Sequence, residues 1–203
     1  MPCFLTHVQV SMWVIIFVNS LLFLLSYFQI DRNLPIVLFQ GKDEVRIENS
    51  VIKGYHAFKV KPPMTYPPTL LSVDIEYTNI HDTDACLVWV PELNSFKSDM
   101  HDIVTDEDRY LLLKDVAGLP VGHVPRTLAS AFRKLIDLGA NVYCEATDQP
   151  QQSFPPWPAP EETGGGAVIP CTYLVRHESK QLVIDVVKEA LMEMPEGDFI
   201  RLV

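Results

Sequence analysis

Hydrophobic and polar positions change their spacing several times along the chain, and each change predicts a different element. The first block is a run of residues without charge, 8–30, VQVSMWVIIFVNSLLFLLSYFQI. About 20 apolar residues are enough for a helix to cross a bilayer. We interpret residues 1–40 as a hydrophobic leader, a candidate transmembrane anchor, and the start of a polar linker. The alternative is a segment unrelated to the function of the domain.

The next patterns are typical of short β-strands separated by turns. VIKGYHAFKV (51–60) and LLSVDIEY (70–77) are rich in strand-forming residues and flank the turn-rich KPPMTYPP. ACLVWVP follows TNIHDTD, whose turn-forming residues would link two antiparallel strands. NVYCEAT (141–147) and AVIPCTYLVR (167–176) are two further predicted strands. RYLLLKDVAGLPVGHVP has strand character that glycine and proline interrupt.

Two segments have helical spacing. Residues 126–138 repeat apolar side chains every three or four positions, and Gly139 follows as a natural stop. The closing segment, 178–194, has the same periodicity. The predicted apolar faces comprise Leu128, Ala131, Phe132, Leu135 and Leu138 in the first helix, and Leu182, Val183, Val186, Val187, Ala190, Leu191 and Met194 in the second.

Two stretches without periodicity complete the pattern. Residues 91–108 are strongly acidic and predict a solvated surface loop, and the prolines and glycines of 149–166 predict an irregular loop. Short strands with one internal and one terminal helix favour a mainly β fold with α additions, a small OB-like, partly open β-barrel. We assign the barrel to residues 51–176 and the C-terminal helix and tail to 177–203.

Composition narrows the range of functions. The chain is 48% hydrophobic and 21% charged, which is typical of a globular protein, and its net charge of −10 lowers the expectation of phosphate binding. An acidic protein can still carry a local basic cleft. No GxxxxGK[ST], GxSxG or HExxH pattern occurs, so we predict neither an enzyme nor a cofactor, and no ATP hydrolysis.

The cysteines and histidines give no metal-site pattern. Cys3, Cys86, Cys144 and Cys171 contain no CxxC pair, and the last three fall in strand-like runs that favour buried thiols. The polar cluster around residues 81–86, together with His56, matches no tight metal-binding spacing. We therefore predict no metal.

Taken in order, several motifs resemble the HIRAN domain, the N-terminal module of certain fork-remodelling helicase-like ATPases. GYHAF is followed by NIHDTDA, which resembles the family's N-x-x-D-x-N-A turn, and then by VGHVP leading into a helix and by IPCTYLVR. The resemblance covers roughly residues 51–176. It implies an OB-like barrel that captures the 3′ end of single-stranded DNA.

The resemblance also implies roles for particular residues. Asp82 matches the aspartate that accepts a hydrogen bond from the terminal 3′-hydroxyl. An ionised carboxylate only accepts hydrogen bonds and repels a phosphate, so it would select a free hydroxyl end. His123 and Arg126 match the residues that hold backbone phosphates, beside a helix N-terminus whose amides suit an anion.

Part of the stacking surface that the family uses is missing. His56 takes a basic position, Ala57 an aromatic one, and Phe58 keeps an aromatic ring; His81 replaces the aromatic residue of the turn. Stacking contributes about 1–3 kcal/mol per base, so two lost rings would weaken binding by about 2–6 kcal/mol.

We therefore predict a non-catalytic, HIRAN-like nucleic-acid-binding module for single-stranded DNA ends. The alternative is a protein-interaction barrel with a degenerate pocket, tethered to a membrane if 8–30 is an anchor. The expected location is nuclear or cytoplasmic, or the cytosolic face of a membrane, because the first cations follow the leader. Structural roles also fit: Asp82 could cap its turn, Arg126 could pair with an acid, and Phe58, Tyr77 and Trp89 could pack in the core.

Overall fold

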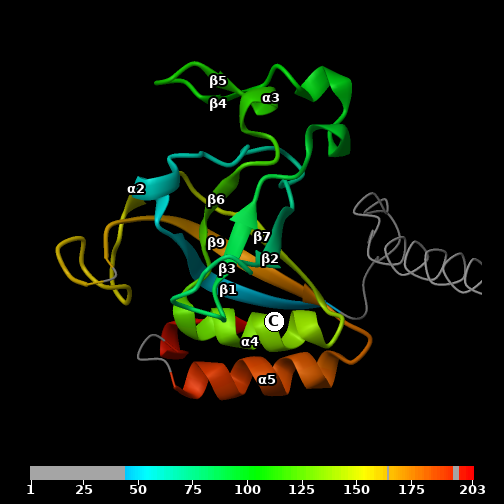
Figure 1. The fold of residues 1–203 in the computed structure, drawn as a ribbon, viewed down its shortest axis with the longest axis vertical. Helices are drawn as coiled ribbons and strands as arrows, with labels where there is room; N and C mark the ends of the chain where they lie inside the picture. The colour runs from blue at the N-terminus through cyan, green and yellow to red at the C-terminus, as the bar shows by residue number, and fades with distance from the viewer. Residues whose placement is uncertain (1–43, 164, 194–196) are drawn as a thin grey trace, which may run out of the picture. The chain divides into compact units, whose positions relative to one another are not determined.

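The structure, a computed structural model, describes residues 44–163, 165–193 and 197–203 (Figure 1). These residues belong to one compact unit, Gly41–Val203. The predicted leader, residues 1–40, lies outside the described residues, and so does the candidate anchor at 8–30. Of the helices within the described ranges, none has the length and hydropathy needed to cross a bilayer.

Six antiparallel strands form a closed barrel. Around the ring the order is β1–β6–β3–β2–β7–β9, and β9 pairs back with β1. The small OB-like barrel predicted from the sequence is confirmed, and it is closed where a partly open barrel was expected. Two short strands, β8 (Gln151–Gln152) and β10 (Arg201–Leu202), extend it at β9 and β1. The ring strands are β1 (Glu44–Lys53), β2 (Leu71–Ile75), β3 (Cys86–Trp89), β6 (Pro120–His123), β7 (Asn141–Ala146) and β9 (Ala167–Arg176).

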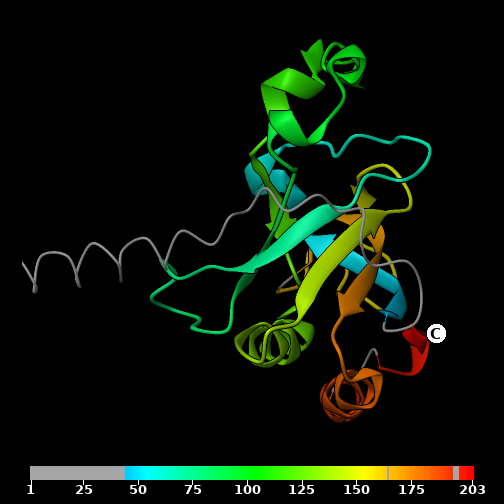
Figure 2. The same cartoon turned by 90° about the vertical axis from the view of Figure 1, so that its right-hand side faces the viewer.

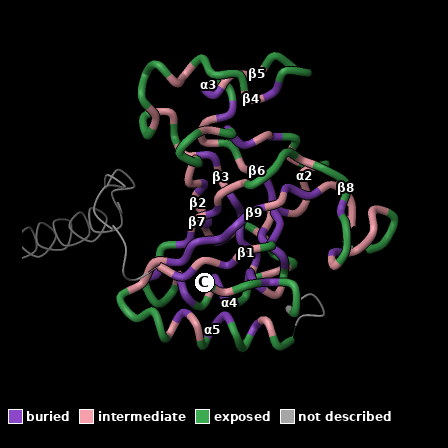
Figure 3. The backbone as a smooth tube through the Cα atoms, turned by 180° about the vertical axis from the view of Figure 1, so that it is seen from behind, coloured by how far each residue is buried: buried purple, intermediate pink, exposed green. Residues whose placement is uncertain are grey.

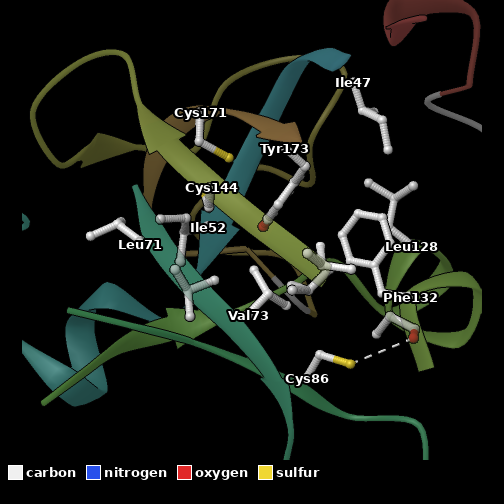
Figure 4. Close-up of a cluster of buried hydrophobic side chains, with 14 of the residues drawn as sticks. Ile47, Ile52, Leu71, Val73, Cys86, Leu128, Phe132, Cys144, Cys171 and Tyr173 are labelled. Carbon is white, nitrogen blue, oxygen red and sulfur yellow. Dashed lines mark hydrogen bonds between the residues drawn. The ribbon is translucent and has the colours of Figure 1, made fainter. Parts of the chain in front are cut away.

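Two helices cover one end of the barrel. α4 (Arg126–Asp137) and α5 (Lys180–Met192) lie side by side, as Figure 2 shows end-on. The apolar face of α4 is buried against the barrel, where the rings of Phe132 and Tyr173 meet edge-on with centroids 5.1 Å apart (Figure 4). Both predicted helices are confirmed. Of the side chains predicted for their apolar faces, Leu138 is an exception, because it is the C-cap of α4 and is 51% exposed, and Met194 lies outside the described residues.

The first strand starts earlier and ends sooner than its sequence pattern predicted. β1 begins at Glu44, before the predicted start of the strand at residue 51, and ends at Lys53. Gly54 has φ +81°, a left-handed conformation that a glycine adopts at little cost, and the chain turns there into the short helix α2 (Tyr55–Phe58). The predicted strand over 51–60 is therefore wrong beyond residue 53, and the motif GYHAF lies on a helical turn.

The acidic stretch is more ordered than predicted. It forms the 3₁₀ turns η2 (Leu93–Ser95) and η3 (Ser98–Met100), the hairpin β4 (Val104–Asp106) and β5 (Leu111–Leu112), and then α3 (Leu113–Val116). We call residues 91–119 the acidic lobe. Its side chains are mostly exposed, whereas the barrel strands are largely buried (Figure 3).

A buried carboxylate attaches the acidic lobe to the segment between α2 and β2. Asp106 is 2% exposed, and its two oxygens accept hydrogen bonds from Lys61 Nζ at 2.9 Å and Arg109 Nε at 2.7 Å. Arg109 also donates to the backbone carbonyl of Lys59. These contacts give the stretch that was predicted as a solvated loop, residues 91–108, a fixed structure.

The irregular loop predicted at 149–166 is largely as expected. Apart from β8 it has no regular structure in its described residues, and it buries the side chain of Trp157. The Ser153 hydroxyl donates to the carbonyl of Pro158 at 2.6 Å, which holds the loop on itself. The described chain ends in a 3₁₀ turn, η4 (Gly197–Phe199), and β10.

Candidate ligand-binding site at the end of β6

The fold brings two sequence motifs together at one place. β3 pairs with β6 so that Leu87 lies opposite His123, and Val124 N donates to Cys86 O at 3.0 Å. The turn that precedes β3 therefore lies beside the segment that leads from β6 into α4. This turn, residues 76–85, carries the NIHDTDA motif, and the segment carries VGHVPR.

Asp82 and Arg126 form an ion pair across this junction. Asp82 Oδ2 lies 3.6 Å from Arg126 Nε, and the arginine side chain is 88% exposed. The other oxygen, Oδ1, accepts the backbone N–H of Asp84 at 3.1 Å, so Asp82 also caps its own turn. Exposed pairs of this kind contribute only about 0–1 kcal/mol, and a ligand can therefore exchange with either partner at little cost.

His123 is held by a carboxylate and an aromatic ring. Its Nε2 lies 3.1 Å from Glu76 Oε2, and its ring meets Phe58 edge-on with centroids 5.2 Å apart. A Cβ at Gly54 would lie 3.7 Å from His123 Nδ1 and from Phe58, an ordinary contact distance, so the imidazole packs beside Gly54. Phe58 is only partly buried, because α2 carries it to the rim of the barrel.

Asn79 organises the turn around Asp82. Its Oδ1 accepts the backbone N–H groups of His81 at 3.1 Å and Asp82 at 3.0 Å. Its Nδ2 donates to Glu76 Oε2 at 2.8 Å. The sequence motif contains this asparagine, but no sequence pattern predicted a role for it or for Glu76. The spacing of Asn79 before Asp82, typical of a side chain that bonds its own backbone two or three residues on, was the available signal.

The remaining candidates lie on either side of this group. His81 is exposed on the turn. His56 is exposed on α2 and faces the start of β9, where a Cβ at Gly166 would lie 3.2 Å from its Nδ1. The contacts therefore join Phe58, Asp82, His123 and Arg126 to one another through Glu76 and Asn79, and they place His56 toward β9.

One expected core residue is on the surface. Tyr77 is 75% exposed, and the guanidinium of Arg133 lies 5.7 Å from its ring centroid. Arg133 also donates to the carbonyl of Thr83 at 2.6 Å, which fastens the turn to α4. The prediction that Tyr77 packs in the core is wrong, because β2 ends at Ile75 and the chain has already turned outward. Ile80, on the same turn, is 86% exposed.

The arrangement provides both an acceptor for a hydroxyl and donors for an anion. Asp82 is the acceptor and Arg126 is the donor, whereas Nε2 of His123 already lies against the Glu76 carboxylate. α4 begins at Arg126 after Pro125, and none of the described side chains caps its N-terminus, so no cap competes for its first amides. In the part of the chain that the structure describes, no three His, Cys, Asp or Glu side chains gather as a metal site.

No protein-family model and no curated protein matches the chain. Among solved structures, the chain is similar to the HIRAN domain of human HLTF, with 16% sequence identity and a TM-score of 0.42. The similarity covers 75% of this chain and 95% of that domain. The assignment of an OB-like barrel rests on the strand order of the barrel itself.

Proposed function

We propose that this protein is a non-catalytic module that binds nucleic acid at the end of β6, with a free 3′ end of single-stranded DNA as its preferred ligand. The observation that carries the proposal is the meeting of Asp82, His123 and Arg126, from distant parts of the sequence, at one exposed edge beside Phe58. The motif resemblance to HIRAN domains gives this group its proposed ligand.

Asp82, Arg126 and Phe58 each have a distinct part in this proposal. The Asp82 carboxylate accepts the 3′-hydroxyl and repels a terminal phosphate. Arg126 leaves its ion pair with Asp82 and contacts the first backbone phosphate, together with the open amides of α4. Phe58 offers one ring for stacking. Because Ala57 and His81 stand where the family has aromatic rings, we expect weak affinity.

The test is a fluorescence anisotropy titration of the full chain with short single-stranded oligonucleotides, labelled at the 5′ end, at low salt. An oligonucleotide with a free 3′-hydroxyl should bind more tightly than the same oligonucleotide with a 3′-phosphate. Asp82→Asn should abolish this difference, and Arg126→Gln should weaken both complexes. Asp108→Asn and Arg201→Gln, which change exposed charges elsewhere, are the matched controls. Equal and negligible binding of both oligonucleotides contradicts the proposal.

The second candidate is a protein-binding barrel that uses the same edge. It is favoured by the exposed Tyr77 and Ile80 on the turn and by the net charge of −10. A partner that the full chain retains after nuclease treatment, and that Tyr77→Ser with Ile80→Ser releases, would support it. The membrane tether through residues 8–30 stays a prediction from the sequence.

A further inference from the structure

We propose that Glu76 is the positioning residue of this site: its carboxylate fixes both His123 and the turn that carries Asp82, and its charge weakens the attraction of the site for phosphate. The part that concerns phosphate rests on the proposed function. The positioning itself concerns the free protein and can be measured without a ligand.

A single oxygen of Glu76 joins the two halves of the site. Oε2 accepts hydrogen bonds from Asn79 Nδ2 at 2.8 Å and from His123 Nε2 at 3.1 Å. The backbone of Glu76 is itself fixed, because its N–H donates to Ala85 O at 2.8 Å across the turn. The side chain is 21% exposed, so these bonds are partly shielded from water.

On one side, this oxygen sets the orientation of the Asn79 amide. An ionised carboxylate can only accept, so Asn79 must direct its Nδ2 toward Glu76 and its Oδ1 away from it. That Oδ1 then accepts the N–H groups of His81 and Asp82. The reversed amide would place two acceptors together and leave both backbone donors unsatisfied. Glu76 therefore determines where the turn holds Asp82.

On the other side, it sets the tautomer of His123. With an obligate acceptor at Nε2, the neutral imidazole carries its proton on Nε2, and Nδ1 is the nitrogen that faces Gly54. The ring of Phe58 limits its rotation by edge-on contact. Nδ1 is thus the ring nitrogen that Glu76 does not occupy, and in the neutral ring it can accept a hydrogen bond but cannot donate one.

The charge and the position of Glu76 can be separated by mutation. Both hydrogen bonds end on the same oxygen, and the amide oxygen of glutamine can also accept two bonds. Glu76→Gln therefore keeps the arrangement and removes a negative charge beside His123. Glu76→Ala removes the charge and the arrangement together.

The first measurement is made on the free, full-length protein. Long-range ¹H–¹⁵N spectra of the histidine rings, with His123 assigned by its loss in His123→Gln, report which ring nitrogen carries the proton. We expect the Nε2–H tautomer in the wild type and in Glu76→Gln, and a mixture of tautomers in Glu76→Ala. A wild type with the proton on Nδ1, or an unchanged tautomer in Glu76→Ala, overturns the positioning role.

The second measurement is the anisotropy titration with the 3′-hydroxyl oligonucleotide. We expect Glu76→Gln to bind severalfold more tightly than the wild type, because one repulsive charge is gone. Glu76→Ala should bind about tenfold more weakly, the effect of losing one or two hydrogen bonds that hold the site. Glu48 is a half-buried glutamate on another strand, β1, and serves as the control. Glu48→Gln and Glu48→Ala should both bind like the wild type.

The outcomes separate the two proposals. If the tautomers behave as expected but neither the wild type nor any variant binds the oligonucleotide, the proposed function fails and the positioning role stands. If the wild type binds and Glu76→Ala binds equally well, the positioning role is overturned for the ligand. If Glu76→Gln binds as weakly as Glu76→Ala, the charge effect is overturned.

Discussion

Asp82 and Arg126 each have a structural role in the free protein, and the proposed function gives each a second role with a ligand. Asp82 caps its turn with one oxygen and pairs with Arg126 through the other. The pair is exposed and therefore weak, so it can keep the two side chains in place without opposing a ligand strongly. In the proposed function, the same ion pair orders the two side chains in the free protein and gives way when a ligand binds.

The partial loss of stacking rings predicts that one substitution weakens oligonucleotide binding and that another strengthens it. Phe58→Ala should weaken oligonucleotide binding by about 1–3 kcal/mol, because one base loses its ring. Ala57→Tyr should strengthen binding by a similar amount, because Ala57 is exposed on α2 where the family has an aromatic ring. Anisotropy titrations of both variants measure the two effects.

The control for these variants is Phe199→Ala, which removes a ring that is 57% exposed near β10 and should leave binding unchanged. A loss of affinity in Phe199→Ala equal to that in Phe58→Ala would mean that the oligonucleotide contacts the surface without a defined site. Thermal unfolding of each variant would show whether α2 still folds.

For single residues, the sequence allowed the motif residues to be located. It did not allow us to predict the side chains that they contact. Asp82, His123 and Arg126 were candidates because their motifs have a recognisable order. Glu76 was missed because its role depends on a contact with His123, 47 residues away, which no local pattern encodes. Tyr77 was expected in the core because aromatic residues usually are, yet it lies just past the point where the strand ends.

Among the elements, those with a repeated pattern were predictable and the short ones were not. α4 and α5 have 12 and 13 residues, enough for a 3.6-residue period to show. α2 and α3 have four residues each, which is about one turn and carries no period. The hairpin of the acidic lobe was missed because its order depends on Asp106 and its partners in other segments.

The attachment of the acidic lobe gives a prediction about stability. Burial alone would raise the pKa of Asp106, but hydrogen bonds from Lys61 and Arg109 outweigh it and hold the pKa below its ordinary value. Asp106→Asn should therefore lower the free energy of opening of the lobe by about 1.5–3 kcal/mol at neutral pH. Hydrogen exchange of the amides in β4 and β5 measures this opening.

The pH dependence of the same contact follows from the direction of the shift. Because the pKa is lower in the folded state, the stabilisation is present above the unfolded pKa of about 3.9 and is lost as pH falls through the folded pKa. Asp108 bonds the same Lys61 at 3.2 Å but its side chain is 88% exposed, so Asp108→Asn should change little. Equal effects of the two substitutions would contradict the role given to burial.

For the molecule as a whole, the barrel buries the three cysteines that the structure describes. Cys86, Cys144 and Cys171 are free and buried, as their strand-like surroundings predicted. Burial raises the pKa of Cys86 to about 12 and also raises that of Cys144. Since the thiolate is the reactive form, native protein should hardly react at these positions.

Thiol labelling of the Cys3→Ser variant would check this expectation. In native buffer, labelling of the three core thiols should be slow, and its rate should rise with denaturant together with global unfolding. Ser130→Cys in the same background places a thiol on the exposed face of α4 and should label at once. Fast native labelling of Cys86 or Cys144 would mean that the barrel opens far more readily than its burial implies.

The ring of strands is closed unevenly. β1 pairs with β9 along most of its length, but with β6 only at Lys53 opposite His123 within the described strands. The backbones approach so closely there that a Cβ on Gly122 would collide with the carbonyl oxygen of Lys53. Thermal separation of the barrel strands should begin where β1 meets β6, beside His123. A ligand that contacts both strands would oppose their separation. Binding at the site should therefore raise the melting temperature of the protein.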